Sequence, residues 1–329
     1  MIDIFQTNKI DMTNEAFKFI DLFSGIGGMR IPFDEIGGTC VYSSENDQYS
    51  QKTYESFFGE RPDGDITQID ISTIPKFDIL LAGFPCQPFS HAGLRKGLDD
   101  KRGNLFFNIK AILNKHKPKA FLLENVPGLN THDNQRTIKK MHKELSEIGY
   151  EFDSKILAAK DFNLPQRRRR LYMVAFKNKR LQKKFMFPEI QTLTNKFKNI
   201  MEKKPDSKYT ISDKLWIGHQ ERKKRNKKRG VGFGYAIFDE NSEFVNTISA
   251  RYNKDGSEIL IAQKNKNPRK LTPLEAARLQ GFPDKIVKRA LDSGVSEAQL
   301  YKQFGNAVPI NVVRAISKNM MKVLFNNAK

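Results

Sequence analysis

Short apolar runs alternate with longer amphipathic runs through the first half of the chain, and this alternation constrains the fold most strongly. The apolar runs end at Gly, Pro or polar residues, as buried strands do, and they span 17–23, 39–44, 77–84 and 119–125. Helical spacing of apolar residues occurs between them, at 47–57, 104–116 and 134–148. We therefore predict an α/β fold built on a doubly wound, mostly parallel sheet, with ligands bound at the carboxyl ends of the strands.

The sequence changes character in its second half. A further strand is predicted at 171–176, but residues 186–268 are dense in Lys and Asn and lose their periodicity. This change predicts a second, smaller, loop-rich domain. Regular spacing returns at 272–282, where Thr272, followed by Pro-Leu-Glu, is the expected N-cap of a helix. A last helix is expected at 309–324.

The charge balance points to a polyanionic partner. The chain of 329 residues has 57 Lys and Arg against 37 Asp and Glu, a net charge of +20. Its two cysteines, Cys40 and Cys86, form no disulfide framework. The first residues lack a secretory pattern, and no apolar run approaches the roughly 20 residues that a membrane span needs. We therefore expect a cytoplasmic protein without a membrane partner.

The first predicted strand ends in Asp-Leu-Phe-Ser-Gly-Ile-Gly-Gly. Gly25, Gly27 and Gly28 would let the backbone approach a ligand at a helix start, although a tight turn without a ligand explains them as well. Glu45 lies 20 residues after Gly25 and could accept both ribose hydroxyls of a cofactor, and Asp65 could reach an adenine amino group. The layout fits a nucleoside cofactor without a pyrophosphate better than a dinucleotide.

Cys86 lies in Gly-Phe-Pro-Cys-Gln-Pro-Phe-Ser, directly after a predicted buried strand. A thiol there would lie at the carboxyl edge of the sheet, where it could attack as the thiolate. An inert packing role suits Cys40, inside an apolar strand, better than Cys86 between two prolines. Glu124 ends the next strand at the same edge, so a protonated carboxyl group could donate a hydrogen bond to a substrate ring nitrogen beside the thiol.

Two basic runs are candidates for phosphate contacts. In Gln-Arg-Arg-Arg-Arg at 166–170, alternate residues share a face, so the even-numbered ones can serve the active site while Arg167 and Arg169 meet phosphates. Residues 222–229 hold seven basic side chains in eight positions, next to glycines and aromatic residues. Such runs are often solvated loops, but this setting favours contact with phosphates.

Taken in order, these segments resemble the motifs of bacterial DNA cytosine-5 methyltransferases, the methylases of type II restriction-modification systems. The matching segments are FIDLFSGIGG at 19–28, GFPCQPFS at 83–90, ENV at 124–126, QRRRR at 166–170, RKLTPLEAARLQGFP at 269–283 and QFGNAVP at 303–309. The resemblance implies the S-adenosylmethionine-dependent methyltransferase fold. It extends from about Phe19 to the end of the chain.

The resemblance also implies a mechanism. The target cytosine is flipped out of the duplex, Cys86 attacks its carbon 6, and Glu124 stabilises the ring at nitrogen 3. Carbon 5 then takes a methyl group from S-adenosylmethionine, and loss of the carbon 5 proton expels the thiolate. Arg170 is expected to hold the cytosine carbonyl oxygen with Arg168 in support, while the backbone of Phe84 meets the exocyclic amine.

The same matching gives the residues expected to bind S-adenosylmethionine. They are Phe23, Gly25, Ile26, Gly27, Gly28, Glu45, Asp65, Ile66, Pro85, Leu105, Asn306 and Val308. The chain departs from the family pattern at Asn46, where well-known members have a Trp that packs on adenine, so stacking would rely on Phe23 and Ile66. Residues 91–104 match a loop that closes over DNA, with glycines suited to hinges.

Double-stranded DNA is the expected partner of a protein that we predict to be a monomer. The expected DNA contacts are Ser90, Arg167, Arg169, Arg222, Lys223, Lys224, Arg225, Lys227, Lys228, Arg229 and Thr247, the last of which begins a Thr-Ile pair common in target-recognition domains. The expected domains are a catalytic and cofactor-binding domain (1–185), a target-recognition domain (186–268), a hinge with the late helix motif (269–300), and a C-terminal helix that returns to the first domain (301–329). A restriction endonuclease acting on the same site, without a stable complex, would complete the system.

Three other functions fit parts of the sequence. An RNA cytosine methyltransferase on the same scaffold would share the Cys86 and Glu124 motifs, but the roughly 80 residues before the late motif favour DNA. A DNA-binding module without activity would need neither Cys86, Glu124 nor Arg170. A nicotinamide oxidoreductase is disfavoured by the glycine spacing and by the Pro-Cys-Gln segment.

Overall fold

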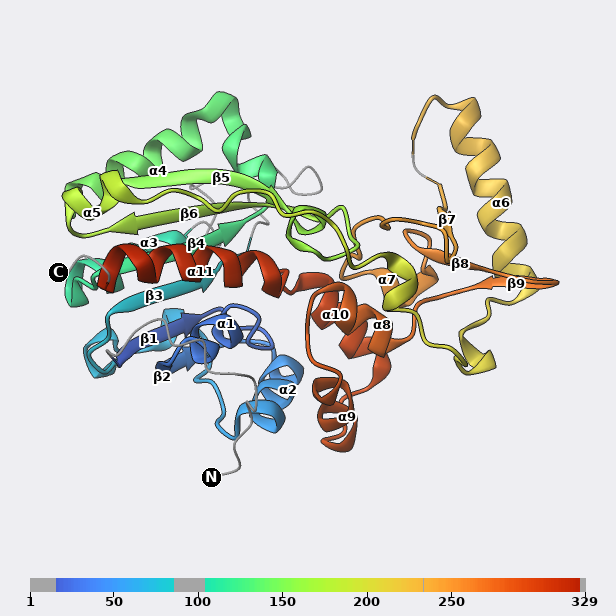
Figure 1. Cartoon of the computed structure of the whole chain (residues 1–329), viewed down its shortest axis with the longest axis horizontal. Helices are drawn as coiled ribbons and strands as arrows, with labels where there is room; N and C mark the ends of the chain where they lie inside the picture. The colour runs from blue at the N-terminus through green and yellow to red at the C-terminus, as the bar shows by residue number, and fades with distance from the viewer. Residues whose placement is uncertain (1–15, 86–103, 233, 326–329) are drawn as a thin grey trace.

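The computed structural model describes residues 16–85, 104–232 and 234–325, and its larger part is built on a six-stranded sheet. The order across this sheet is β2-β1-β3-β4-β6-β5. The strands are β1 (Phe17–Leu22), β2 (Gly38–Ser44), β3 (Ile79–Gly83), β4 (Ala120–Asn125), β5 (Phe152–Ala158) and β6 (Arg169–Phe176). The α/β prediction is confirmed, and Figure 1 shows helices on both faces of the sheet.

The sheet is mixed, because β6 runs against its neighbours. β1 to β4 are parallel, whereas β6 pairs antiparallel with both β4 and β5. The chain turns from β5 to β6 within residues 159–168, which leaves no room for the helical crossover that a parallel pair needs. β5 is a strand that the sequence analysis did not predict, because its burial pattern leaves Asp153, Ser154 and Lys155 exposed.

Helices cover the two faces of the sheet with separate apolar clusters. One face packs on α3 and α4, through side chains such as Ile109 and Met141, and the other on α1, α5 and α11, through Phe33 and Ile316. These helices are α1 (Arg30–Glu35), α3 (Asn104–His116), α4 (Arg136–Glu147), α5 (Lys179–Lys184) and α11 (Ile310–Phe325). The helices expected at 104–116, 134–148 and 309–324 are thus present. In Figure 1, α11, near the C-terminus, lies along the sheet.

A second lobe, formed by α6 to α10 and β7 to β9, lies beyond the carboxyl edge of the sheet (Figure 1). Its elements are α6 (Asp213–Lys228), α7 (Tyr252–Asp255), α8 (Pro273–Leu279), α9 (Lys285–Asp292), α10 (Glu297–Asn306), β7 (Ile237–Phe238), β8 (Leu260–Gln263) and β9 (Lys266–Arg269). A third apolar cluster joins this lobe to the sheet region, since it includes Ile26 and also Phe57 of α2 (Gln48–Phe58).

The second lobe contains more regular structure than the sequence analysis expected. Residues 222–229 were considered as a loop, but most of them form the last turns of the 16-residue helix α6. Its apolar residues cluster at Leu215–Ile217 and charged residues follow, so no apolar stripe marks the helix in the sequence. The N-cap prediction is confirmed, because Thr272 and Glu275 form a capping box with Pro273 in the first turn. Within the described residues, every helix is too short or too polar to span a membrane.

Candidate active site

A cavity of about 410 Å³ opens at the carboxyl ends of β1, β3 and β4. Its walls come from the glycine-containing turn after β1, the segment after β2, the end of β3, and the junction between α10 and α11. The volume falls within the roughly 300–1,000 Å³ typical of small-molecule sites. The prediction placed the ligand at this edge of the sheet, and the cavity lies there.

Glu45 fixes the turn after β1 to the end of β2. One carboxylate oxygen accepts a hydrogen bond from the backbone N–H of Gly25 at 2.8 Å, and the other accepts one from Asp47 at 2.8 Å. Burial raises the pKa of Glu45, and these backbone hydrogen bonds oppose the rise. Gly25 has a φ of +56°, a conformation that favours glycine. The carboxylate lines the cavity and keeps lone pairs free for the hydroxyls of a ligand.

Three buried polar side chains of the cavity wall were not predicted from the sequence. Asp21 is 1% exposed, Ser24 7% and Gln303 4%. Within the described part of the chain, both Asp21 carboxylate oxygens, the Ser24 hydroxyl and the Gln303 amide nitrogen lack a hydrogen-bond partner. Buried polar groups are usually hydrogen-bonded, so these atoms indicate a polar ligand. The burial of a carboxyl group inside the apolar Phe-Ile-Asp-Leu-Phe run was the available signal for Asp21.

Eight of the twelve residues expected to bind the cofactor line the cavity: Phe23, Gly25, Ile26, Gly28, Glu45, Pro85, Asn306 and Val308. The other four are placed elsewhere. Gly27 faces the ring of Phe58, and Asp65 caps the short 3-10 helix Ile66–Gln68 by accepting from Thr67. Ile66 is buried in the apolar cluster that α3 covers, and Leu105, in the first turn of α3, packs against the same cluster. Asn46 is exposed and is absent from the cavity wall.

Glu124 and Arg170 form an ion pair at the inner end of the cavity. Arg170 Nε lies 3.0 Å from Glu124 Oε1, and both side chains are largely buried. β4 and β6 position them, because β6 is antiparallel to β4 and its first residues lie beside the last residues of β4. Burial raises the pKa of Glu124, and the charges of Arg170 and Arg168 oppose the rise. Burial thus favours the protonated form of this carboxyl group, and a protonated carboxyl group can donate a hydrogen bond.

The predicted alternation along 166–170 is confirmed. Gln166 and Arg168 are buried, Arg170 turns to Glu124, and Arg167 and Arg169 are exposed. Arg168 does not line the cavity; its guanidinium donates to the backbone carbonyls of Ile248, Gly305 and Asn306. Arg168 therefore reaches the cavity through the backbone of Gly305 and Asn306, which line it.

The segment before Cys86 is held at the cavity. Phe84 and Pro85 line it, and the Asn125 side chain donates a hydrogen bond to the Phe84 carbonyl at 3.1 Å. The predicted nucleophile Cys86, the predicted DNA contact Ser90 and most of the predicted closing loop at 91–104 lie outside the described residues. The other cysteine, Cys40, is half-buried in β2, where burial raises its pKa to about 12. This environment suits the packing role predicted for it.

Two basic residues of α6, Arg222 and Lys223, contact side chains outside the helix. Arg222 donates to the Asp255 carboxylate at 2.8 Å and contacts His219, while Lys223 lies over the Tyr235 ring. Exposed side chains follow at Lys224, Arg225, Lys227, Lys228 and Arg229. The sequence analysis treated all seven alike, since Asp255 and Tyr235, which contact Arg222 and Lys223, lie outside the basic run. Thr247 is half-buried and precedes Ile248, whose backbone N–H donates to the Gln166 side chain just before β6.

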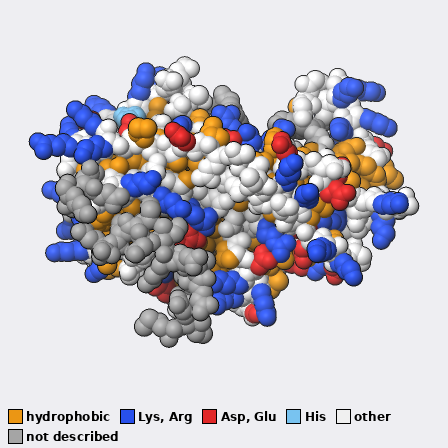
Figure 2. All heavy atoms as spheres, in the orientation of Figure 1, with side chains coloured by type: hydrophobic (Ala, Val, Ile, Leu, Met, Phe, Trp, Pro, Cys, Tyr) orange, Lys and Arg blue, Asp and Glu red, His pale blue; other side chains and the backbone are white. Residues whose placement is uncertain are grey.

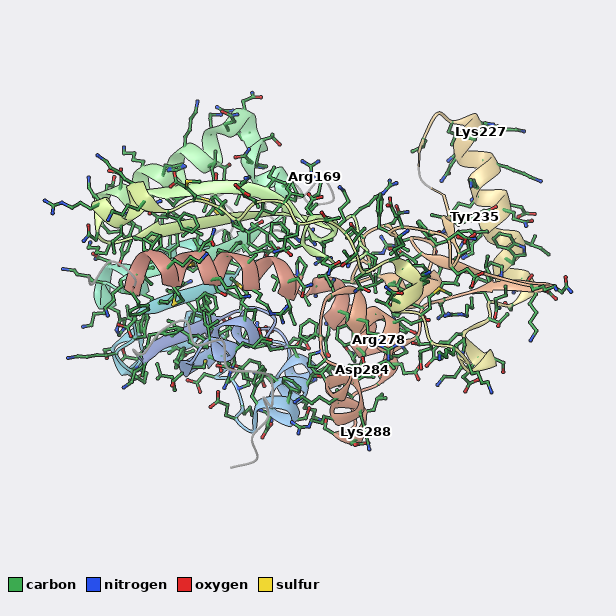
Figure 3. All side chains as sticks on the ribbon, in the orientation of Figure 1. Arg169, Lys227, Tyr235, Arg278, Asp284 and Lys288 are labelled. Carbon is green, nitrogen blue, oxygen red and sulfur yellow. The ribbon has the colours of Figure 1, made fainter. Side chains whose placement is uncertain are left out.

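The surface is hollowed between the sheet region and the second lobe, and Lys and Arg side chains are visible on both (Figure 2). Arg169 at the end of β6 and Lys227 on α6 lie on opposite sides of this hollow, as Figure 3 shows. The cavity and the hollow together combine a small-molecule site with a basic surface.

Comparison with known proteins agrees with this geometry. The family model of the C-5 cytosine-specific DNA methylases matches residues 17–322. The type II methyltransferase M.DsaV of Dactylococcopsis salina is 52% identical over 95% of this chain and 88% of its own length, and M.HhaI of Haemophilus parahaemolyticus is 39% identical over 93% and 94%. The Dnmt2 methyltransferase of S. pombe has the same fold, with a TM-score of 0.76 at 22% identity, covering 94% of this chain and 99% of that one. The chain belongs to the C-5 cytosine-specific DNA methylase family and is a DNA (cytosine-5-)-methyltransferase.

Proposed function

We propose that this enzyme flips a cytosine out of a short duplex site and methylates carbon 5 through covalent attack by Cys86. The observation that carries the proposal is the meeting of three features at one edge of the sheet. The Glu124–Arg170 pair and the segment Phe84–Pro85 both line the cavity for a small molecule. Cys86 is the next residue in the sequence. A methyl donor and a target base bound there would both be near the thiol.

The cavity wall fits S-adenosylmethionine. Burial raises the pKa of the Asp21 carboxyl group, and a ligand that carries cationic groups would oppose that rise. Ser24 and Gln303 supply hydrogen-bonding atoms that lack protein partners within the described residues. Glu45 supplies carboxylate oxygens for ribose hydroxyls. S-adenosylmethionine supplies an electrophilic methyl group when bound. Asn46 offers no ring for stacking, so the adenine contacts of this enzyme would differ from those of family members with a Trp there.

Each catalytic side chain then has one task. The Cys86 thiolate adds to carbon 6 of the flipped cytosine and makes carbon 5 nucleophilic. Glu124, whose protonated form is favoured by burial, would donate a hydrogen bond to ring nitrogen 3, and Arg170 would hold the carbonyl oxygen and the carboxyl group in place. After methylation, loss of the carbon 5 proton restores the double bond and expels the thiolate.

The hollow between the lobes is the proposed site of double-stranded DNA. Arg169 lies on one side of the hollow and α6 on the other, and the exposed Arg167, Arg169 and basic residues of α6 would contact phosphates. The target-recognition domain proposed at 186–268 would read bases through residues that include Thr247. This surface, with the net charge of +20, favours DNA over a small-molecule substrate.

The biological role that we propose is protection of host DNA in a type II restriction-modification system. The relatives that cover most of this chain carry the name type II methyltransferase. A monomer acting in the cytoplasm, with a separate endonuclease that cuts the same unmethylated site, fits this role.

Bisulfite sequencing of DNA from cells that express the protein tests the proposal. The expected result is 5-methylcytosine at one short sequence, absent in cells that express Glu124→Ala. Methylation of RNA with unmodified DNA would establish the competing RNA substrate. Unmodified DNA and RNA, with folded protein present, would overturn the proposal.

A further inference from the structure

We propose that Arg168 is a positioning residue that couples target recognition to cofactor binding. The inference rests on the proposed function. Two short segments carry it: the recognition segment, residues 245–250, which contains Thr247, and the cofactor wall, Gly305–Asn306, which lines the cavity. They are more than 50 residues apart in the sequence, and one buried guanidinium joins them.

Arg168 contacts both segments directly. Its side chain is 1% exposed, and Nη1 donates to the Ile248 carbonyl at 3.1 Å. Nη2 donates to the carbonyls of Gly305 at 3.0 Å and Asn306 at 3.3 Å. Its charge also acts on Glu124, since it opposes the rise of the glutamate pKa that burial causes. A single side chain therefore contacts backbone beside Thr247 and backbone of the cofactor cavity, and acts on the catalytic carboxyl group.

The recognition segment is further attached to the residues just before Arg168 and β6. Gln166 forms a parallel bridge with Val245, and Arg167 N–H donates to the Val245 carbonyl at 2.9 Å. The Gln166 side chain accepts from Ile248 N–H at 3.1 Å and donates to the Leu279 carbonyl at 3.0 Å. The segment cannot shift relative to β6 without breaking several buried hydrogen bonds.

The cofactor wall also packs directly on the recognition segment. A Cβ atom on Gly305 would overlap the backbone of Ser249 and Ala250, so the two chains approach as closely as glycine allows. Displacement of residues 249–250 by bound DNA would therefore act on Gly305 and Asn306. Arg168 donates to carbonyls of both segments, and the N–H groups of its rigid, planar guanidinium point in fixed directions. A displacement of one segment would therefore be transmitted to the other.

The experiment measures S-adenosylhomocysteine affinity by calorimetry, alone, with the duplex site identified by bisulfite sequencing, and with a duplex lacking that site. The coupling ratio is the dissociation constant alone divided by that with the specific duplex. We expect a ratio of at least about 5 for the wild type, in the usual range of coupling between sites. Arg168→Lys keeps the charge but cannot reach three carbonyls with a fixed fork, so its ratio should fall to within about twofold of 1.

Arg314→Lys is the matched control. Arg314 donates two hydrogen bonds to Glu35 and one to Asn311, so the variant also loses a multidentate guanidinium, but neither segment is involved. Its coupling ratio should equal that of the wild type. Melting temperatures separate loss of coupling from loss of stability. Gly305→Ala perturbs the same contact from the other side and should also lower the ratio, which keeps the test available if Arg168→Lys does not fold.

A wild-type ratio near 1, or an unchanged ratio in Arg168→Lys, would overturn the coupling while leaving methylation intact. By linkage, the cofactor product must tighten binding of the specific duplex by the same factor, so titration of the duplex with and without S-adenosylhomocysteine gives a second measurement of the coupling ratio, and a ratio near 1 in that titration would likewise contradict the inference. Absence of S-adenosylhomocysteine binding to the wild type would instead count against the proposed function itself.

Discussion

Substitution of Gly27 by Ala tests the role that the structure gives to the glycine turn after β1. Gly27 has a φ of +80° and does not line the cavity. A Cβ atom there would lie 2.5 Å from Phe58 Cζ and overlap the ring. The ring cannot move aside easily, because Tyr54 packs on it with centroids 4.5 Å apart and the Arg30 guanidinium carbon lies 4.1 Å from its centroid.

The expected loss of unfolding free energy has two parts. Holding a non-glycine residue at positive φ costs roughly 1–2 kcal/mol, and overpacking of a filled site adds roughly 1–3 kcal/mol. Gly27→Ala should therefore destabilise the protein by about 2–5 kcal/mol. Gly59 is the matched control, since it has a φ of +79° and no atom within 4 Å of its Cβ position. Gly59→Ala should lose only the backbone part, about 1–2 kcal/mol.

Urea unfolding of both variants, followed by tryptophan fluorescence and far-ultraviolet circular dichroism, measures this difference. The reduced entropy of the unfolded chain that accompanies Gly→Ala is common to both and cancels in the comparison. The slope against urea should stay the same, so that the midpoints report stability alone. If Gly27→Ala were no more destabilising than Gly59→Ala, the clash with Phe58 would not be the reason for glycine at position 27.

Two further predictions concern the catalytic acid and the basic helix. Glu124→Gln should lower kcat by roughly 10²–10⁴-fold, since the amide cannot transfer a proton. Burial raises the pKa of Glu124, so the folded state favours the protonated form and wild-type kcat should decline as pH rises through that raised pKa. The free energy of unfolding should also decline with rising pH, between the unfolded-state pKa of about 4.3 and the raised pKa of the folded state. The Gln variant should lose both of these alkaline limbs in pH profiles of turnover and unfolding, and their persistence would assign them to another group. In filter-binding titrations, replacing Lys224, Lys227 and Lys228 by Ala should weaken binding to all duplexes alike and should reduce the slope of log affinity against log salt concentration by about 0.9 per lost phosphate contact. Ala at the exposed Lys139, Lys140 and Lys143 of α4 should change neither the affinity nor this slope. Equal effects of the two triple variants would mean that α6 contributes only net charge.

Local sequence patterns predicted the parts of the fold that depend on local interactions. The strands of the first half and the helix at 104–116 were predicted because their apolar residues repeat with a clear period. The antiparallel direction of β6 follows from a short connection and a pairing partner, neither of which a period reveals. The helix α6 was missed because Trp216 and His219 anchor it to distant residues such as Tyr235 and Asp255.

The same distinction holds at the site. Glu45 and Glu124 were predicted from strand ends, since parallel strands bring their carboxyl ends together. Arg170 was predicted from the alternation along residues 166–170 and from the family resemblance. Asp21 lacks a hydrogen-bond partner among the described residues, and Gln303 of α10 contacts Thr53 of α2; neither feature is specified by a local pattern. Arg168 was expected to support the site; that its partners are backbone carbonyls of two distant segments required the structure.

Trapping with 5-fluorocytosine tests covalent catalysis by Cys86 most directly. Fluorine at carbon 5 cannot leave as a cation after methylation, so elimination stops and the bond between the thiol and carbon 6 persists. A duplex with this base at the target should give a denaturation-resistant adduct in the presence of S-adenosylmethionine, mapped by mass spectrometry to the peptide that contains Cys86. Cys86→Ser should form no adduct, while Cys40→Ser should form it, since Cys40 packs in β2 with a pKa of about 12. Methylation of natural DNA without any adduct on the fluorinated duplex would contradict the account.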